Sequence, residues 1–446
     1  MVDLMEKIVS LAKRRGFIFP GSEIYSGLSG TYDLGPFGVE LASNIKKAWW
    51  KRIVYERDDV VGLDSSVLLS SKVWQASGHT DSFTDPLVEC KNCHSRFRED
   101  HLPKSKSCPT CGKKDWTESR MFNLMFKTQI GPVENEDNTT YLRPETAQGI
   151  FINFDNIVNT MRVKLPFGIA QIGRGFRNEI TTGNFLYRVR EFEMMELEYF
   201  TYPKQSEKDF EYWQKERMSF WTDLGLNKKN LRFREHEETE RAHYALRSVD
   251  IEYNWPFNRV QGKPGWGELE GIANRTDYDL KAHSRASGKD LSYFDEESKQ
   301  KIVPYVIEPA VGVGRAMLAF LIDAYYEEKA PTAEKGESET RVILKLHPEL
   351  APVKTAVLPL VKDPKLIKIA KVVYKDLKKS WNTFYDEAGT IGRRYRRQDE
   401  IGTPFCLTVD FDTLKDDSVT VRDRDSMRQE RVKIKELISS LRKKFN

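Results

Sequence analysis

Apolar residues repeat along this chain with two different spacings. Near the N-terminus, in MVDLMEKIVSLAKRRGF, and again from about Val39, they recur every three or four residues, which is the period of an amphipathic helix. Between Arg120 and Pro203 the spacing shortens, and segments such as MFNLMFKTQI and FGIAQIGRGF alternate as strands do. The pattern therefore predicts a mixed fold in which strands and loops dominate this middle region.

A second pattern begins near residue 340. The segment EEKAPTAEKGESET is polar, lacks periodicity and contains Pro and Gly, so it predicts a linker. Beyond it, the apolar segments TAVLPLV and TPFCLTVDF are separated by helical segments, which favours a small α/β domain. We therefore expect a first domain at 1–330, a linker at 331–340 and a second domain at 341–446. Within the first domain, the polar segment 204–246 is interpreted as a mostly helical insertion.

Composition excludes two broad classes of protein. The chain has 446 residues, of which 39% are hydrophobic and 31% charged, and these proportions are typical of soluble globular proteins. No run of eighteen apolar residues occurs, and the N-terminus lacks the features of a signal peptide, so we expect a cytoplasmic protein without a membrane contact. A net charge of +4 is too small for a protein that binds nucleic acid over its whole surface.

The segment RGFRNEITTGNFLYRVREFEMMELEYF has the pattern of a hairpin but carries many charges. Alternation along the first strand would place Arg177 and Glu179 on one face, and a turn around Gly183 would follow. Along the return strand, Arg188, Arg190 and Phe192 would share one face, with Glu191 and Glu193 on the other. An ordinary core strand would not carry these charges, because burying an unpaired charge is very unfavourable. Rigidly held guanidinium groups suit polyphosphate, and a nearby phenyl ring offers a stacking face for a base.

The order FRNE, turn, RVREF resembles motif 2 of the class II aminoacyl-tRNA synthetases, whose pattern is F-R-x-E, loop, R-x-x-x-F. AVGVGRAMLAFLIDAYYEE resembles their motif 3, and RPETAQGIF resembles their T/R-x-E loop. Within this class, the chain resembles the homodimeric glycyl-tRNA synthetases over nearly its whole length. The segments that carry this resemblance include DLGPFGVEL, KVWQASGHTDSFTDP and GWGELEGIANRTDYDL. The resemblance implies an α+β fold, with an antiparallel sheet flanked by helices. It also implies a homodimer that uses ATP and Mg²⁺ to attach glycine to tRNA(Gly).

The resemblance implies roles for the hairpin in binding ATP. Arg177 would hold the α-phosphate and the glycine carboxylate, and Arg188 and Arg315 would hold the β/γ end, so Arg177 and Arg315 are the expected catalytic residues. Phe192 would stack on adenine, and Glu179 would contact the edge of the base. The full set of expected ATP-binding residues is Arg177, Asn178, Glu179, Tyr187, Arg188, Val189, Arg190, Glu191, Phe192, Glu268, Leu269, Gly312, Val313, Gly314 and Arg315.

The same resemblance implies an acidic pocket, formed by Glu145, Glu193 and Glu308, for the glycine ammonium group. Glu268 would bind Mg²⁺ with help from neighbouring carboxylates. The full set of expected glycine-binding residues is Arg98, Glu145, Phe192, Glu193, Met194, Met195, Glu196, Glu308, Pro309, Ala310, Val311 and Gly312. No general base is needed, because a carboxylate is already a nucleophile at neutral pH, and positioning and charge stabilisation supply the catalysis.

Some residues depart from the family pattern or admit a simpler interpretation. Ala310 stands where the family usually has Ser, and Ser71 stands where a proline usually precedes KVW. The segment 258–264 is interpreted as an insertion before GWGEL. Arg190 and Glu196 are also open to interpretation as paired charges on a strand surface. Met194 and Met195 are equally typical of packing residues.

Four cysteines lie in an insertion at about 86–116, with the spacing CxxC-x14-CxxC. They are Cys90, Cys93, Cys108 and Cys111. Two such pairs suit a tetrahedral structural Zn²⁺ site, and a pair of disulfides is the alternative. Because the insertion carries basic residues, contact with the tRNA acceptor end is a further hypothesis. A fifth cysteine, Cys406, lies in an apolar strand and is expected to be buried core.

The second domain resembles the anticodon-binding domain shared by the glycyl, threonyl, prolyl and histidyl enzymes. Its basic strip suits single-stranded RNA, because arginines meet phosphates and aromatic rings stack on unpaired bases. The candidate residues are Arg393, Arg394, Tyr395, Arg396 and Arg397. Solvated surface charge is the alternative interpretation of these arginines.

Two other functions stay open on the sequence alone. One is a class II synthetase for a different amino acid, although the cysteine-only cluster argues against the threonyl enzymes, which use a catalytic zinc. The other is a synthetase-like RNA-binding protein that charges no tRNA. Retention of Arg177, Glu179, Phe192 and Arg315 argues against it, because such a protein needs no complete ATP site.

Overall fold

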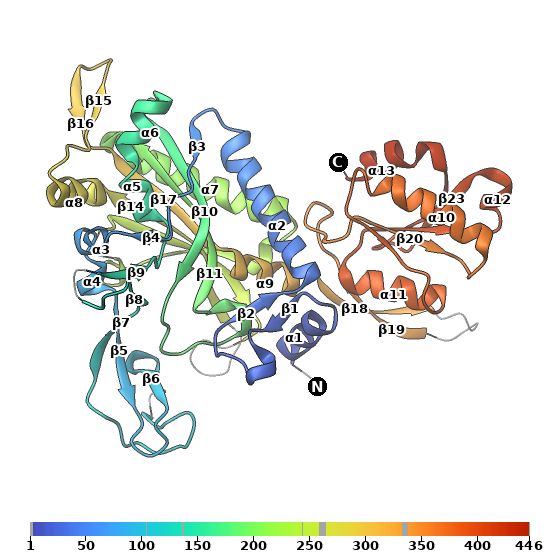
Figure 1. Cartoon of the computed structure of the whole chain (residues 1–446), viewed down its shortest axis with the longest axis horizontal. Coiled ribbons are helices and arrows are strands. Elements are labelled where there is room, and N and C mark those ends of the chain that lie inside the picture. Colours follow the sequence, from blue (N-terminus) through green and yellow to red (C-terminus); the bar gives the residue numbers. More distant parts are fainter. Residues whose placement is uncertain are drawn as a thin grey trace. The chain divides into compact units, whose positions relative to one another are not determined.

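The computed structural model describes residues 3–103, 105–135, 138–242, 244–257, 265–331 and 338–445. The described residues form two compact units, whose elements are labelled in Figure 1. The larger unit comprises Pro20–Tyr32 and Trp49–Ala319. The smaller unit comprises Met1–Phe19, Asp33–Ala48 and Phe320–Asn446.

A sheet forms the centre of the larger unit. Within the described residues it has seven strands in the order β12-β13-β14-β17-β11-β10-β3. They are β3 (Val60–Gly62), β10 (Phe167–Phe176), β11 (Glu191–Thr201), β12 (Leu231–Glu235), β13 (Arg247–Trp255), β14 (Gly265–Thr276) and β17 (Tyr305–Gly312). Neighbouring strands are antiparallel except β3 and β10, which are parallel. The predicted α+β architecture with an antiparallel sheet is confirmed.

Helices and aromatic side chains cover this sheet. Helix α7 (Ser206–Asp223) lies along it in Figure 1, and the buried Arg217 Nε of this helix donates to Glu270 Oε1 of β14 at 2.7 Å. A core cluster joins α5 (Ala147–Phe151) and α6 (Phe154–Met161) to β10 and β11, with Phe154, Phe167 and Phe200 in contact. The segment 204–246 thus contributes a helix, as predicted, and also the edge strand β12, which the sequence analysis did not separate from it.

The N-terminal helices agree with the apolar period. The first is α1 (Leu4–Arg14), and the helix predicted from about Val39 is α2 (Pro36–Trp50). The latter begins three residues early because Pro36 occupies its first turn, where a missing N–H is tolerated. The described residues contain no helix of the length and apolar character needed to cross a membrane.

The charged hairpin has shorter strands than predicted. Strand β10 ends at Phe176 and β11 begins at Glu191, so Arg177, Glu179, Arg188 and Arg190 all lie in loop 177–190. Asn184 and Phe185 have φ values of 55° and 56°, and two successive residues in the left-handed region cannot continue a strand. The expected placement of Arg177 with Glu179 on one strand face, and of Arg188 and Arg190 with Phe192 on another, is therefore wrong, because these arginines and Glu179 are not in strands.

The cysteine-rich insertion has its own small sheet. Strand β5 (Thr84–Glu89) lies between β6 (Arg96–Arg98) and β7 (Arg120–Asn123), and both pairings are antiparallel. The segments that carry the cysteines lie beyond the paired region of these strands. The insertion predicted at 258–264 lies outside the described residues.

The smaller unit contains the predicted α/β arrangement. Its described strands follow the order β21-β20-β22-β23-β24, with β20 parallel to both of its neighbours. They are β20 (Thr355–Pro359), β21 (Thr383–Tyr385), β22 (Phe405–Val409), β23 (Ser418–Asp423) and β24 (Gln429–Lys433). Helices α10 (Pro364–Leu377), α11 (Ile391–Ile401) and α13 (Leu437–Phe445) accompany them. Cys406 packs in the core as predicted.

The segment expected to be a linker is partly in strands. β18 (Tyr325–Pro331) pairs antiparallel with β19 (Ser338–Leu344). Residues 332–337 lie outside the described residues.

A buried ionic cluster stabilises the smaller unit and generates the first prediction. Asp399 is fully buried and accepts hydrogen bonds from Arg341 Nε at 2.7 Å and from Arg422 Nη1 at 2.9 Å. Asp399→Asn removes the carboxylate partner of the buried Arg422 and one of the two carboxylate partners of the buried Arg341, which keeps Glu328, so we expect a loss of about 3–5 kcal/mol in the free energy of unfolding. Urea denaturation measures this loss. The control is Asp412→Asn, which removes an exposed pair with Lys415 and should change stability by less than about 0.5 kcal/mol. Equal effects of the two substitutions would contradict this account.

Candidate active site

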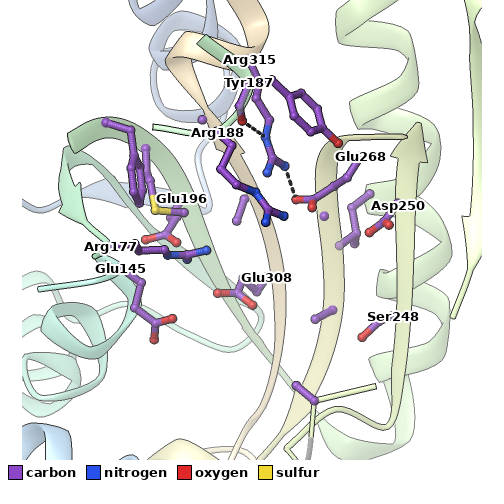
Figure 2. A pocket seen from close by; sticks show the side chains of 18 of the residues that line it. Glu145, Arg177, Tyr187, Arg188, Glu196, Ser248, Asp250, Glu268, Glu308 and Arg315 are labelled. Carbon is purple, nitrogen blue, oxygen red and sulfur yellow. Dashed lines mark hydrogen bonds and ion pairs between the residues drawn. The ribbon is translucent and has the colours of Figure 1, made fainter. Parts of the chain in front are cut away.

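A cavity of about 380 Å³ lies within the larger unit. Its walls come from β11, β13, β14 and β17, from loop 177–190, and from the start of α9 (Val313–Ala324). Figure 2 shows Arg177 beside Glu145, Glu196 and Glu308, and Arg188 and Arg315 on the side of Glu268. The cavity therefore has one end rich in carboxylates and one end where arginines and carboxylates meet.

Arg177 lies between two aromatic rings. Its guanidinium carbon is 5.4 Å from the ring centroids of both Phe83 and Phe192, and its Nε donates to the Pro144 carbonyl at 3.2 Å. Phe192 faces Gly175 across the strand pair, and a Cβ on that glycine would lie 2.8 Å from the ring. The absence of a side chain at Gly175 thus lets the phenyl ring pack closely against β10. The ring and the guanidinium hold each other in a fixed orientation.

Arg188 and Arg315 form the cationic part of the other end. Arg315 Nε donates to the Tyr187 carbonyl at 3.1 Å, and Arg315 Nη1 lies 2.9 Å from Glu268 Oε1. Arg188 Nη1 lies 3.8 Å from Glu179 Oε2. Each arginine is thus paired with a carboxylate of the same cavity, which holds it extended toward the space where an anion would bind.

Three carboxylates line the acidic end. Glu196 accepts a hydrogen bond from the backbone N–H of Thr146 at 2.6 Å and another from its hydroxyl. Burial, together with the charges of Glu308 and Glu145, raises the pKa of Glu196 to about 7. Burial likewise raises the pKa of Glu308, although Arg275 opposes this shift. For Glu145 burial also favours the neutral form, but His79 and then Arg275 outweigh it and lower the pKa.

A buried network supports these carboxylates from below. Arg275 Nη1 donates to Glu308 at 3.0 Å, and Arg275 Nε donates to Asp279 at 2.8 Å. Gln148 Nε2 donates to both Glu145 and Asp279 at 3.0 Å. The Tyr244 ring, which lines the cavity, covers the Arg275 guanidinium at 3.9 Å from its centroid. The network fixes the side chains of two of the three carboxylates by direct hydrogen bonds.

Two carboxylates at the other end can hold a divalent cation. Glu268 and Asp250 both line the cavity, and burial and the charge of Glu268 raise the pKa of Asp250 to about 6. His236 Nε2 lies 2.9 Å from Asp250 Oδ2. Such mutual repulsion between acids is relieved by a cation, and carboxylate oxygens are the ligands that Mg²⁺ prefers. The residues at this end therefore fit Mg²⁺.

The structure brings many of the expected site residues together. Those expected residues that line the cavity are Glu145, Arg177, Glu179, Tyr187, Arg188, Val189, Phe192, Met194, Glu196, Glu268, Glu308, Ala310, Gly312, Gly314 and Arg315. Glu196 is fully buried and hydrogen-bonded here, so its interpretation as a strand-surface charge is wrong. Ala310 lines the acidic end, as its expected role in binding glycine requires.

Other expected residues lie outside the cavity. They are Asn178, Arg190, Glu191, Leu269 and Val313 from the ATP set, and Arg98, Glu193, Met195, Pro309 and Val311 from the glycine set. Side chains alternate along a strand, so Glu193 and Met195 lie on the face of β11 opposite Phe192, Met194 and Glu196. The expected trio of Glu145, Glu193 and Glu308 is therefore corrected, because Glu196, and not Glu193, lines the cavity beside Glu145 and Glu308. Along β17, Pro309 and Val311 alternate with Glu308 and Ala310 in the same way.

Arg98 and Glu191 are held elsewhere. Arg98 Nη1 lies 2.8 Å from Asp85, and Arg98 Nη2 donates to Asp100 at 2.7 Å. Glu191 pairs with Arg174 across the strands.

Several residues that line the cavity were not predicted from the sequence. They are Leu186, His236, Glu240, Ala242, Tyr244, Ser248, Asp250, Gly271, Ile272 and Ala273. Most belong to β13, β14 or the turn before β13, and 204–246 was interpreted as an insertion rather than as part of the site. The alternation in RSVDIEYNW was the available signal, since it places Asp250 and Glu252 on one face of a strand.

The four cysteines of the insertion converge. Their sulfur atoms all lie within 4.8 Å of one another, with Cys90 and Cys111 at 3.6 Å and Cys93 and Cys108 also at 3.6 Å. Four thiolates around Zn²⁺, with Zn–S bonds of about 2.3 Å, stand roughly 3.8 Å apart, so the cluster fits this ion. All four thiols are free, and the sulfur separations exceed a disulfide bond of about 2.05 Å, which argues against the disulfide alternative.

The basic strip of the smaller unit is largely engaged within that unit. Arg394 is buried and donates to the carbonyl of Leu360, and Arg397 donates to Asp386 at 2.5 Å. Arg396 donates to Glu339 at 2.8 Å, and Arg422 covers the Tyr395 ring at 4.7 Å from its centroid. Arg394 is therefore buried within the unit, whereas Tyr395, Arg396 and Arg397 are half-buried and have partners within the unit, and the role of these residues in binding the anticodon stays a prediction. Arg393 is exposed.

Comparison with known proteins identifies the family. Residues 126–325 match the tRNA synthetase class II core domain (G, H, P, S and T), and residues 354–444 match an anticodon binding domain. A glycine–tRNA ligase from Thermobifida fusca is 55% identical, with 97% of this chain and 96% of the relative covered. One from Caldanaerobacter subterraneus is 52% identical, with 99% and 98% covered. The chain belongs to the glycine–tRNA ligase family.

A solved structure agrees with the fold. Prolyl-tRNA synthetase from Cryptosporidium parvum superposes with a TM-score of 0.65 at 16% identity, and 98% of this chain and 76% of the other are covered. The resemblance to class II synthetases, and within them to the glycyl enzymes, is therefore confirmed. The homodimeric type stays a prediction.

The acidic end generates a prediction on pH dependence. The pKa of Glu196 is about 7, above the ordinary value of 4.5, so its stabilising contribution is present below pH 4.5 and is lost as the pH rises through 7. In Glu196→Gln the free energy of unfolding should consequently fall less steeply between pH 4.5 and 7 than in the unaltered protein. Urea denaturation across this range measures the two slopes. Glu296→Gln, at an exposed position, is the control and should keep the original slope. An unchanged slope in Glu196→Gln would overturn this assignment.

Proposed function

We propose that the cavity binds glycine and ATP side by side, joins them as glycyl adenylate, and transfers glycine to the 3′-terminal ribose of tRNA(Gly). The observation that carries this proposal is the division of charge within one cavity. The carboxylates Glu145, Glu196 and Glu308 suit the glycine ammonium group, whereas Arg188 and Arg315 suit a polyphosphate. Arg177 lies between these two regions (Figure 2), where a carboxylate and an α-phosphate would meet.

Binding of ATP would use both rings and charges. Phe192 offers its face to adenine, with Arg177 fixed against the same ring, and Glu179 would accept a hydrogen bond from the base. Arg188 and Arg315 would exchange part of their pairing with Glu179 and Glu268 for phosphate oxygens. Mg²⁺, when held by Glu268 and Asp250, would neutralise charge on the phosphates.

The first chemical step needs no general base. The glycine carboxylate attacks the α-phosphorus, the bond to the bridging oxygen breaks, and pyrophosphate leaves toward Arg188 and Arg315. Arg177 would stabilise the charge that builds up on the non-bridging oxygens. Preorganised guanidinium groups supply this stabilisation without reorganising during the reaction, because their carbonyl and carboxylate partners already hold them in place.

Selection of glycine would follow from a fixed ammonium group and restricted space. Glu145, Glu196 and Glu308 would hold the nitrogen, and Met194 and Ala310 border the same end of the cavity. An added methyl group must then overlap one of these walls, and overpacking destabilises by about 1–3 kcal/mol. Ala310 lacks the hydroxyl of the serine that the family resemblance implies at this position, but its methyl group would still form part of the cavity wall.

Further roles complete the proposal. We propose that residues 1–330 form the catalytic domain and residues 341–446 the anticodon-binding domain, joined by 331–340, and the two family matches at 126–325 and 354–444 support this division. Within the catalytic domain, 86–116 is the zinc-binding insertion and 204–246 a second insertion. The enzyme would act in the cytoplasm as a homodimer. Of the anticodon candidates, the exposed Arg393 best suits contact with RNA phosphate.

Amino-acid-dependent exchange between ATP and pyrophosphate tests the proposed function. The purified protein should catalyse exchange with glycine and show little or none with alanine, serine or threonine. Arg177→Ala should reduce glycine-dependent exchange by at least about 100-fold, the scale of removing a preorganised transition-state donor. Exchange with a different amino acid would refute the glycine assignment, and no exchange with any would favour a protein that binds RNA without charging it.

Metal analysis tests the zinc proposal. The purified protein should contain about one Zn²⁺ per chain, because four thiolates complete one tetrahedral site. Cys93→Ser should lose this zinc and unfold at a lower temperature, yet keep glycine-dependent exchange, since no cysteine of the cluster lines the cavity. The matched control, Cys406→Ser, alters a buried cysteine of the smaller unit and should keep the zinc. Full zinc retention in Cys93→Ser would rule out the cluster as the metal site.

A further inference from the structure

Loop 177–190 presents its functional side chains to the cavity without the support of a strand ladder. Glu179 and Arg188 line the cavity from this loop, and one isolated bridge, between Gly183 and Arg188, is assigned within it. The hydrogen bonds of that bridge are long, at 3.3 Å in both directions. Something other than this bridge must therefore hold Glu179 and Arg188 in position.

A segment that is distant in sequence packs against this loop. We call residues 21–32 the strap, and Pro20–Tyr32 belongs to the same compact unit as the loop. Ser29 Oγ and Thr182 Oγ1 are 2.8 Å apart, and the rings of Tyr32 and Phe185 meet edge to face at 5.1 Å. The strap thus contacts the far end of the loop through both polar and aromatic groups.

Gly30 marks the closest approach of the strap to the loop. Its φ is +75°, and a Cβ there would lie 2.2 Å from Thr182 Cγ2. Both its conformation and its contact therefore exclude a larger residue. The two segments are packed without space between them at this point.

Arg190 joins the strap to the loop. Its backbone N–H donates to the Gly30 carbonyl at 2.8 Å, and its Nη1 donates to the Ser29 carbonyl. Its Nη2 donates to the Glu179 carbonyl at 3.0 Å, and its own carbonyl accepts from the Arg177 N–H at 2.9 Å. One half-buried residue thus bonds to both segments and to the backbone of two cavity residues.

These contacts distinguish Arg190 from a substrate ligand and from a solvated charge. Its guanidinium lies outside the cavity, so it does not meet substrate there. The acceptors of its described side-chain hydrogen bonds are backbone carbonyls, which occur at fixed positions, rather than mobile carboxylates. A planar guanidinium can satisfy two carbonyls in two directions at once, which a single ammonium cannot do with the same geometry.

We infer that Arg190 is a positioning residue that clasps loop 177–190 to the strap and so holds Glu179 and Arg188 at the ATP end of the cavity. This inference rests on the proposed function, because it assigns ATP to that end. The carboxylates of the glycine end belong to strands or to the buried network beneath them, so the clasp acts on ATP and leaves glycine binding largely unaffected.

Steady-state exchange kinetics test the inference. Arg190→Ala should lower kcat/KM for ATP by about tenfold or more, equivalent to about 1.4 kcal/mol, while the KM for glycine changes by less than about twofold. The melting temperature should stay close to that of the unaltered protein, since Arg190 is not a core residue. Arg190→Lys should recover part of the loss, because a lysine can reach one of the two carbonyls.

A substitution in the strap provides an independent test of the same inference. Gly30→Ala should lower kcat/KM for ATP in the same way, and the double variant Gly30→Ala with Arg190→Ala should be little worse than either alone, because both open one contact. The control is Arg174→Ala, which removes an exposed ion pair with Glu191 on the same hairpin and should leave both constants unchanged.

The outcomes separate the inference from the function on which it rests. Absence of glycine-dependent exchange in the unaltered protein would refute the proposed function. Full exchange in that protein, together with an unchanged kcat/KM for ATP in Arg190→Ala, would refute the clasp alone. Equal losses on the glycine and ATP sides, or fully additive losses in the double variant, would also refute it.

Discussion

The arrangement of carboxylates at the acidic end of the cavity depends on Arg275. Among the described residues of the network beneath that end, it is the one buried guanidinium group. It donates to Asp279 and Glu308, while Glu145 and Glu196 lie nearby. A fifth acid, Glu198, is fully buried, and no described group donates a hydrogen bond to either of its oxygens. Burial and then the charge of Glu308 hold the pKa of Glu198 well above its ordinary value. Arg275 and the cavity-lining Arg177 cannot offset five acids, so the acidic end favours binding of a further cation, and in the proposed function this cation is the ammonium group of the amino acid.

The sheet explains why the carboxylates of the acidic end point into the cavity. Along β11, Phe192, Met194 and Glu196 share one face, and along β17, Glu308, Ala310 and Gly312 share the matching face, so two neighbouring strands deliver an aromatic ring and two carboxylates to one space. Loop 177–190 and the start of α9 then add the arginines. Arg177 stands where β10 ends, and Arg315 stands in the first turn of α9, where each can reach the substrates from a rigid element. In the proposed function, residues on rigid strands would thus select the amino acid, whereas Glu179 and Arg188, on a loop that needs external support, would contact ATP.

Motifs in the sequence predicted the fold and much of the site. The apolar periods located α1, α2, β10 and most elements of the smaller unit, because local spacing alone determines which face of an element is buried. The face of β11 was harder to predict, since Glu193 and Glu196 look equally suitable until the strand register is known. Arg190 was assigned to ATP because it lies within motif 2, but its partners Ser29 and Gly30 are distant in sequence and became visible only when the strap folded against the loop. The burial of Arg394 and the packing of Arg422 on the Tyr395 ring left no local signal for the same reason, because both depend on residues distant in sequence.

The central claim is that the acidic end binds a positively charged nitrogen. Isothermal titration calorimetry with a non-hydrolysable sulfamoyl analogue of glycyl adenylate tests it most directly, in comparison with the isosteric propionyl analogue that carries a methyl group in place of the ammonium. The two ligands share the adenosine and the linkage, so their difference reports on the acidic end alone. The account predicts that the propionyl analogue binds weaker by on the order of 30-fold or more, because it leaves buried carboxylates without a counter-charge. Equal affinities would contradict the account.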